Sequence, residues 1–151
     1  MKRLIILIVL LTGALCNVSA QDRRHPTHTS TTKSDEIKSF ITQMYNDKLY
    51  EDYAFLQKHC STELLKKLQD AYPYDTDGRA YATWLFRSGQ QDSKPGSDDK
   101  TIMLEVKADG DWFVYTALDM GWKFANRIKI TSKGGKIVIE DICAVKEQPH
   151  Q

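Results

Sequence analysis

The stretch TALDMGWKFANRIKI, residues 116–130, contains the carboxylate whose neighbours are best suited to chemistry. Asp119 and Trp122 flank Met-Gly, and Tyr115 precedes them in the same alternating run. An indole that excludes water raises the pKa of a nearby carboxyl group, which would make Asp119 a general base. The same residues are also ordinary turn chemistry, because Asp at the first position and Gly at the third favour a β-turn. We therefore expect DMGW to form a hairpin, with Asp119 as the single catalytic candidate.

Arg87 ends an aromatic run within YATWLFRSGQQD, residues 81–92. An arginine held beside rings can bind a carboxylate or phosphate through two N–H groups. The structural alternative is that Arg87 pairs with Asp92 or Asp119, or extends its charged head into water. Ligand pockets combine aromatic walls with a few polar groups. The predicted pocket lining is therefore Tyr81, Trp84, Arg87, Tyr115, Asp119 and Trp122.

The histidines and cysteines suggest neither a metal site nor a nucleophile. His59 and Cys60 are sequence neighbours, which point about 100° apart on a helix, so we expect a helix-end histidine. His25 and His28 are two ligands only, and two do not make a closed metal site; no metal and no cofactor is expected. Cys60 and Cys143 could form a disulfide in an oxidising compartment, or each could be a small buried apolar residue.

The first twenty residues have the three-part pattern of a secretory signal peptide. Lys2 and Arg3 precede the apolar run 4–15, and Val-Ser-Ala at 18–20 suits cleavage before Gln21. The run is shorter than the roughly 20 apolar residues of a membrane-spanning helix. We expect an exported protein, periplasmic or secreted, with no membrane span. Lipidation of Cys16 is the alternative, although Leu15 stands where a lipid-attachment motif has a small residue.

The processed chain is nearly neutral and long enough for one domain. Loss of Lys2 and Arg3 changes the formal net charge from +1 to −1. Nucleic-acid binding calls for a strongly basic face, so we expect no nucleic-acid partner. Residues 21–33 are polar and aperiodic and are predicted to be a flexible linker. The domain is expected over 34–147, followed by a disordered tail, 148–151.

Hydrophobic periodicity predicts helices first and strands afterwards. Helices are expected from Ser34, around residues 50–56 and from Ser61, whereas 80–88 is ambiguous. After residue 100 the period becomes two, with turns at Met120-Gly121 and Gly134-Gly135. The expected strands are 102–107, 112–118, 122–130 and 137–142. Short turns require antiparallel pairing, so the predicted fold class is α+β, with N-terminal helices packed on a curved sheet of about four strands.

Three segments carry a resemblance to a known superfamily: LLKKL (64–68), YATWLFRSGQQD (81–92) and DMGW (119–122). With the helix-then-sheet order, they resemble the nuclear-transport-factor-two-like superfamily, also called the cystatin-like or ketosteroid-isomerase-like cone. The chain is more closely similar to an exported bacterial group of this shape whose function is uncharacterised. The resemblance covers about residues 35–145 and implies a long helix inside a curved sheet, with a hollow at the wide end.

The superfamily includes enzymes, transport factors and binding modules, so the fold alone implies no activity. We expect an exported, non-catalytic binding module for a small molecule or an envelope protein. One alternative is a cone-fold isomerase, dehydratase or hydrolase that uses a pocket carboxylate. Another is an inhibitor or immunity-like protein that inserts loop 89–100 into a partner. Because Lys123, Arg127 and Lys129 alternate onto one sheet face, we expect a monomer, with a dimer as the alternative.

Overall fold

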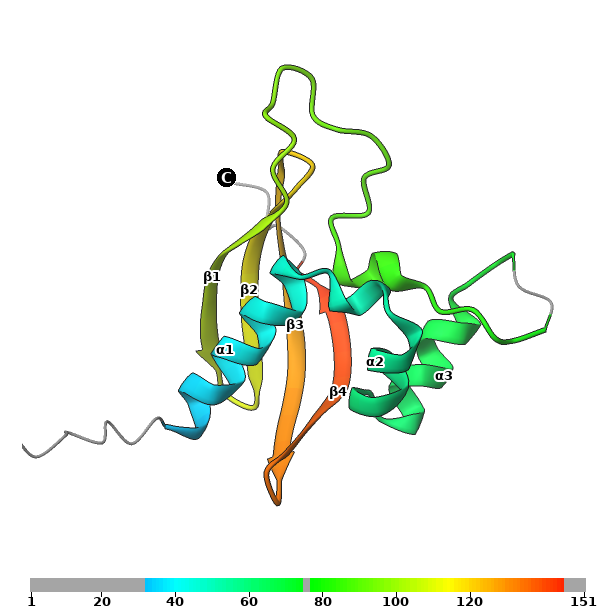
Figure 1. The fold of residues 1–151 in the computed structure, drawn as a ribbon, viewed down its shortest axis with the longest axis vertical. Helices are drawn as coiled ribbons and strands as arrows, with labels where there is room; N and C mark the ends of the chain where they lie inside the picture. The colour runs from blue at the N-terminus through cyan, green and yellow to red at the C-terminus, as the bar shows by residue number, and fades with distance from the viewer. Residues whose placement is uncertain (1–31, 75–76, 146–151) are drawn as a thin grey trace, which may run out of the picture. The chain divides into compact units, whose positions relative to one another are not determined.

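The computed structural model describes residues 32–74 and 77–145 of the chain (Figure 1). The predicted signal peptide, Cys16, most of the predicted linker with His25 and His28, and the tail lie outside the described residues. Within the described ranges, no helix is long and apolar enough to cross a membrane. The same ranges contain no cluster of three His, Cys, Asp or Glu side chains that could hold a metal ion.

Three α-helices and a 3₁₀ turn form the N-terminal half of the described chain. They are α1 (Lys33–Asn46), η1 (Leu49–Glu51), α2 (Tyr53–His59) and α3 (Thr62–Asp70). Thr32, not Ser34, caps α1: its Oγ1 accepts a hydrogen bond from the Asp35 N–H at 3.2 Å. Ser61 caps α3 by accepting from Leu64 N–H at 3.1 Å. These caps satisfy backbone donors that the first helical turn leaves free.

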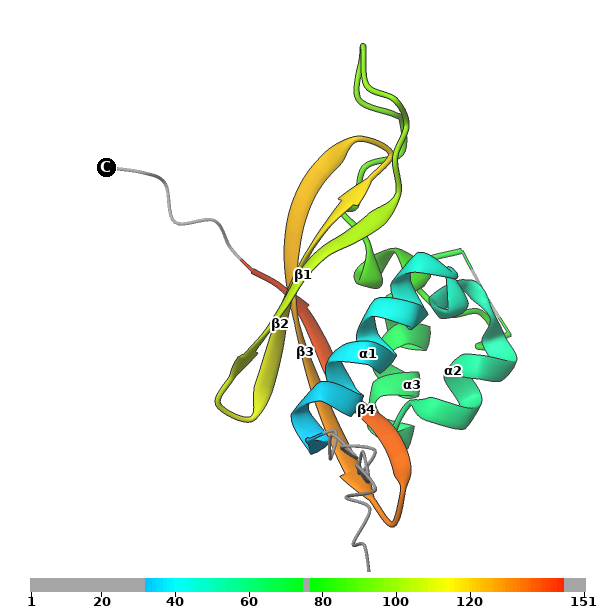
Figure 2. The same ribbon diagram turned by 60° about the vertical axis from the view of Figure 1, so that its left-hand side comes forward.

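The ambiguous segment forms a short 3₁₀ helix, η2 (Thr83–Phe86), and the strands follow it. They are β1 (Ile102–Asp109), β2 (Trp112–Asp119), β3 (Trp122–Lys133) and β4 (Lys136–Ala144). They form one sheet in the order β1-β2-β3-β4, with every neighbouring pair antiparallel. The helices pack on one face of this twisted sheet (Figures 1 and 2). The predicted α+β class and the antiparallel meander are confirmed.

Aromatic rings fill the space between the sheet and α1. Tyr45 of α1 packs on Tyr50 with ring centroids 5.5 Å apart and on Tyr115 of β2 at 6.1 Å. Tyr50 stacks on Phe86 of η2 at 6.0 Å, and Phe124 of β3 lies 5.9 Å from Tyr45. Full burial of a large apolar side chain contributes roughly 1.5–3 kcal/mol. The buried rings of Tyr45, Tyr50 and Phe86 therefore stabilise the packing of α1 on the sheet.

No described helix covers the opposite face of the sheet (Figure 2). The three alternating cations of β3 share that face by their register. Lys123 is exposed, whereas Arg127 and Lys129 are half-buried. Arg127 pairs with Asp109 at 3.1 Å, and Lys129 lies 3.4 Å from Glu140. The predicted sharing of one face by these cations is confirmed. Their carboxylate partners lower the net charge of the face, and the monomer remains a prediction.

The two cysteines of the described chain are free. Cys60 is buried in the core, and its backbone forms an isolated parallel β-bridge with Ile139 of the edge strand β4. Cys143 is exposed and lies opposite Arg127 in the β3–β4 register, on the face away from the helices. Because Cys60 lies in the core on the helix side of the sheet and Cys143 lies on the opposite face, the disulfide considered from the sequence is not formed. The alternative of a small buried apolar residue applies to Cys60 only.

Candidate functional site

The DMGW stretch forms the tight hairpin between β2 and β3. Asp119 is paired with Trp122 across the strands, and the two turn residues have positive φ values, 50° at Met120 and 83° at Gly121. Two central residues with positive φ are typical of the type I′ turns that join antiparallel strands. A Cβ on Gly121 would clash with the Ser97 side chain, so glycine is also needed for the close approach of the loop 88–101. The predicted turn is confirmed.

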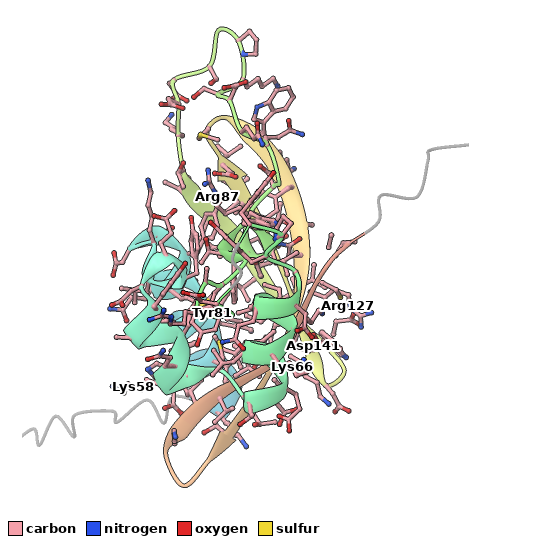
Figure 3. All side chains as sticks on the ribbon, turned by 90° about the vertical axis from the view of Figure 1, so that its right-hand side faces the viewer. Lys58, Lys66, Tyr81, Arg87, Arg127 and Asp141 are labelled. Atoms are coloured by element: carbon pink, nitrogen blue, oxygen red, sulfur yellow. The ribbon has the colours of Figure 1, made fainter. Side chains whose placement is uncertain are left out.

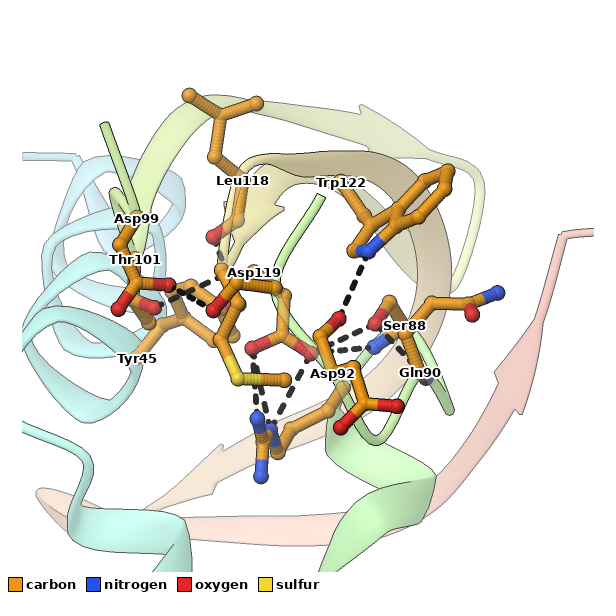
Figure 4. A network of polar contacts seen from close by, with 12 residues as sticks. Tyr45, Ser88, Gln90, Asp92, Asp99, Thr101, Leu118, Asp119 and Trp122 are labelled. Atoms are coloured by element: carbon orange, nitrogen blue, oxygen red, sulfur yellow. Dashed lines mark hydrogen bonds and ion pairs between the residues drawn. The ribbon is translucent and has the colours of Figure 1, made fainter. Parts of the chain in front are cut away.

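Asp119 is fully buried and accepts hydrogen bonds from two consecutive residues (Figure 4). Arg87 donates from Nη2 at 2.9 Å and from Nε at 3.2 Å. Ser88 donates from Oγ at 2.7 Å and from its backbone N–H at 3.2 Å. Of the alternatives considered for Arg87, the ion pair with Asp119 is the one formed.

These contacts determine the ionisation state of Asp119. Burial raises the pKa of its carboxyl group, but the hydrogen bonds from Arg87 and Ser88 together with the Arg87 charge lower it, to a net value below the ordinary 3.8. For Arg87, burial lowers the pKa and the bonds to Asp119 raise it, so that the net shift is upward. A general base at neutral pH needs a raised carboxyl pKa. The environment of Asp119 has the opposite effect, and its lone pairs are already used by donors from Arg87 and Ser88.

Two other polar side chains of the inner sheet face hold the η2 segment. Tyr115 is completely buried and donates from Oη to the Phe86 carbonyl oxygen at 2.8 Å. Asn126 donates from Nδ2 to the Leu85 carbonyl oxygen at 3.1 Å and to Tyr115 Oη at 3.2 Å. Sequence reasoning missed Asn126. A signal was present, because it is the one amide in the apolar set of an alternating strand.

The loop 88–101 is fastened along the β2–β3 hairpin. Trp122 donates from Nε1 to the Asp92 carbonyl oxygen at 2.9 Å (Figure 4). Lys94 donates from its backbone N–H to the Met120 carbonyl oxygen at 2.9 Å, and its ammonium lies 5.8 Å from the Trp122 ring centroid. Trp122 is therefore an anchor for this loop, and the indole is engaged with Lys94 and Asp92.

A pocket of about 520 Å³ opens beside Arg87. Trp84 and Arg87 come from η2 and its end, and the loop provides Gly89, Gln90 and Gln91. The remaining lining residues are Pro73, Tyr74 and Met120. Tyr72 extends the aromatic wall, with its ring centroid 5.2 Å from Trp84 and 6.1 Å from Tyr74. We call this the Arg87 pocket.

Two of the six residues predicted to line a pocket line this one, Trp84 and Arg87. Tyr81 is 5% exposed and packs edge-on against Tyr53, 5.0 Å between centroids. Figure 3 shows Tyr81 deeper among the helices than Arg87, which lies near the base of the loop. Tyr115 belongs to the core and Asp119 lies behind Arg87. Asp119 and Tyr115 support the pocket wall from behind, through hydrogen bonds from Arg87 and to the Phe86 carbonyl oxygen.

A second hollow, of about 600 Å³, lies between α3 and the uncovered face of the sheet. Both of its cations are paired within the lining, Lys67 with Asp141 at 2.7 Å and Lys129 with Glu140 at 3.4 Å, and Glu63 adds a third carboxylate. An anionic ligand would have to compete with these carboxylates for each cation. The Arg87 pocket presents an arginine with donors left over, so it is the stronger candidate.

His59 and Cys60 do not form a catalytic pair. His59 ends α2, and its Nδ1 lies 3.2 Å from the Ile137 carbonyl oxygen, in hydrogen-bonding distance. Its ring packs on Phe55 at 4.6 Å and Phe40 at 5.3 Å. Burial raises the pKa of the Cys60 thiol to about 12, which keeps it protonated and unreactive at neutral pH.

Comparisons with known proteins provide no further assignment. No protein-family model matches the chain, and no curated protein or solved structure matches it significantly.

Proposed function

We propose that the protein is an exported, non-catalytic binding module that takes a small molecule in the Arg87 pocket. The observation that carries this proposal is the bond set from Arg87 and Ser88 to Asp119, which fixes the pocket wall in the free protein. A wall that is already ordered avoids part of the entropy cost of binding. The volume of about 520 Å³ also lies within the range of small-molecule sites.

The same bond set weighs against the enzyme alternative. Asp119, the catalytic candidate, is 0% exposed and is held ionised by Arg87 and Ser88. To act on a ligand, it would have to break these bonds and become accessible. Export rests on the N-terminal pattern of the sequence, and the resemblance to cone-fold proteins is compatible with a binding role.

The test is a fragment screen of the processed chain by ¹H–¹⁵N NMR. The Trp84 indole N–H reports on the pocket, and the Trp112 indole is an internal control because Trp112 lies on the opposite face of the sheet against Arg127. We expect a subset of fragments to shift Trp84 saturably and to leave Trp112 unchanged. If no fragment does so, the small-molecule proposal fails, and the envelope-protein alternative becomes the one to pursue, with loop 88–101 as the surface to alter.

A further inference from the structure

The guanidinium of Arg87 is held along one edge and has a second edge to offer. Nε and Nη2 face Asp119, which is the side-on arrangement of an arginine–carboxylate pair. A guanidinium has five N–H donors in a rigid planar fork. The end-on edge, made by Nη1 and the second N–H of Nη2, is therefore not used by Asp119. The Arg87 side chain is 27% exposed and lines the pocket, whereas Asp119 is 0% exposed, so of the two partners the arginine is the one that a ligand can reach.

The rest of the lining complements a ligand with a negative end. Arg87 is the only ionisable group among the described lining residues apart from the Tyr74 phenol, and none of them is a carboxylate. Gln90 and Gln91 contribute amides that can donate, and Trp84 with Tyr72 and Tyr74 forms an aromatic wall. An anion at Arg87 would therefore have its remaining body beside aromatic rings.

Geometry, more than net charge, makes this site selective. Asp119 balances the charge of Arg87, and the exposed Glu51 also acts on it. Long-range attraction of anions is consequently reduced. Asp119 nevertheless fixes the plane of the guanidinium, and a carboxylate can meet the end-on edge with two parallel hydrogen bonds. A single point charge, such as a lysine ammonium, could not offer this arrangement.

We propose that the ligand of the Arg87 pocket is a small carboxylate with a flat apolar body. Its carboxylate binds the end-on edge of Arg87, and its body lies against Trp84. This inference rests on the proposed function, since it assigns the ligand class of the same pocket. A neutral or cationic ligand would satisfy the proposed function and contradict this assignment.

The test compares phenylacetate with phenylacetamide, which has the same shape and no charge. Each is titrated into the ¹⁵N-labelled processed chain, with the Trp84 indole and Arg87 Nε–H resonances as readouts. Phenylacetate is expected to bind saturably with a Kd in the low millimolar range, and phenylacetamide at least about tenfold more weakly. This comparison needs no variant, so it stands even if substitution of Arg87 unfolds the protein.

A variant pair adds a second criterion. Arg87→Lys keeps the charge and removes the fork, and is expected to weaken phenylacetate binding about tenfold or more. Arg127→Lys, on the opposite face of the sheet, is the matched control and should leave binding unchanged. Equal binding of the amide, or unchanged phenylacetate binding in Arg87→Lys, overturns the carboxylate assignment while pocket binding stands. Absence of saturable shifts with both probes also overturns it, and the fragment screen then decides separately whether the pocket binds ligands at all.

Discussion

Asp119→Asn is the substitution that most directly tests the role of the buried carboxylate. The amide is nearly the same size, so it leaves no cavity. It removes the negative charge beside Arg87 and replaces one acceptor oxygen by an NH₂ group that faces donors. Arg87 Nε and Nη2 and Ser88 N–H and Oγ then compete for a single amide oxygen. The expected result is a folded but clearly destabilised protein.

The magnitude follows from the burial of the two partners. Removing one member of a buried ion pair costs about 3–5 kcal/mol, because the other charge is left without compensation. Arg87 is 27% exposed, so water can partly solvate it after the change. We therefore expect the lower end, about 3 kcal/mol at pH 7. For a domain of this size, 1 kcal/mol corresponds to roughly 4 °C in Tm, so Tm should fall by about 12 °C.

Urea unfolding followed by tryptophan fluorescence, with circular dichroism as a second probe, measures this difference. Asp92→Asn is the matched control, because Asp92 lies in the loop 88–101 that packs on the Asp119 hairpin but is exposed. It should change the free energy of unfolding by no more than about 0.5 kcal/mol. A loss below about 1 kcal/mol in Asp119→Asn, or equal losses in the two variants, would refute the reasoning that Asp119 braces the pocket wall.

The pH dependence of the same difference has a definite sign. The folded-state pKa of Asp119 lies below its ordinary value of 3.8, so its stabilisation is fully present above that value and is lost as the pH falls through the folded pKa. The gap between wild type and Asp119→Asn should stay constant from neutral pH down to about pH 5 and narrow below about pH 4. A carboxyl with a raised pKa would instead make the wild type lose stability relative to the variant as the pH rises.

One labelling experiment and two substitutions test the core. In the native processed chain, Cys60 should resist a thiol-titrating disulfide reagent, because burial raises its pKa to about 12. The exposed Cys143 should react promptly. Two rapidly reacting thiols per chain, or none, would contradict this. Tyr115→Phe should cost about 1.5 kcal/mol, because its buried hydroxyl makes two hydrogen bonds. Tyr50→Phe should be within about 0.5 kcal/mol of wild type or more stable, because no group in the described part of the chain bonds its buried hydroxyl; equal urea-unfolding losses would show that these bonds do not matter.

The sheet could be predicted from the sequence because its determinants are local. Met120-Gly121 and Gly134-Gly135 lie in the turns that join successive strands, and alternation between those turns gives the strands. The irregularity in β1 could not be foreseen. The register shifts between Met103 and Glu105, so that Met103 and Val106 pack against the core. Simple alternation places these two residues on opposite faces, and a one-residue bulge reverses that.

The pocket could be predicted only in part because it depends on contacts between distant residues. Arg87 and Asp119 are 32 positions apart, and no periodicity indicates that they meet. Within the run 81–86, the buried Tyr81 and Phe86 belong to the core and Trp84 lines the pocket, since a 3₁₀ turn distributes neighbouring side chains around its axis. The aromatic composition pointed to the segment that contains Trp84 and Arg87. The backbone conformation determined which of its side chains line the Arg87 pocket.

A carboxylate near tryptophan can serve as a base or as a structural brace, and the second partner decides between them. Desolvation by itself would raise the pKa of Asp119, as the sequence-based hypothesis assumed. Arg87 and Ser88 reverse that effect, because donors at 2.7–3.2 Å stabilise the charged form more than burial destabilises it. The guanidinium that neutralises Asp119 is the same group that faces the pocket. The buried carboxylate therefore acts on a ligand only through the arginine whose orientation it fixes.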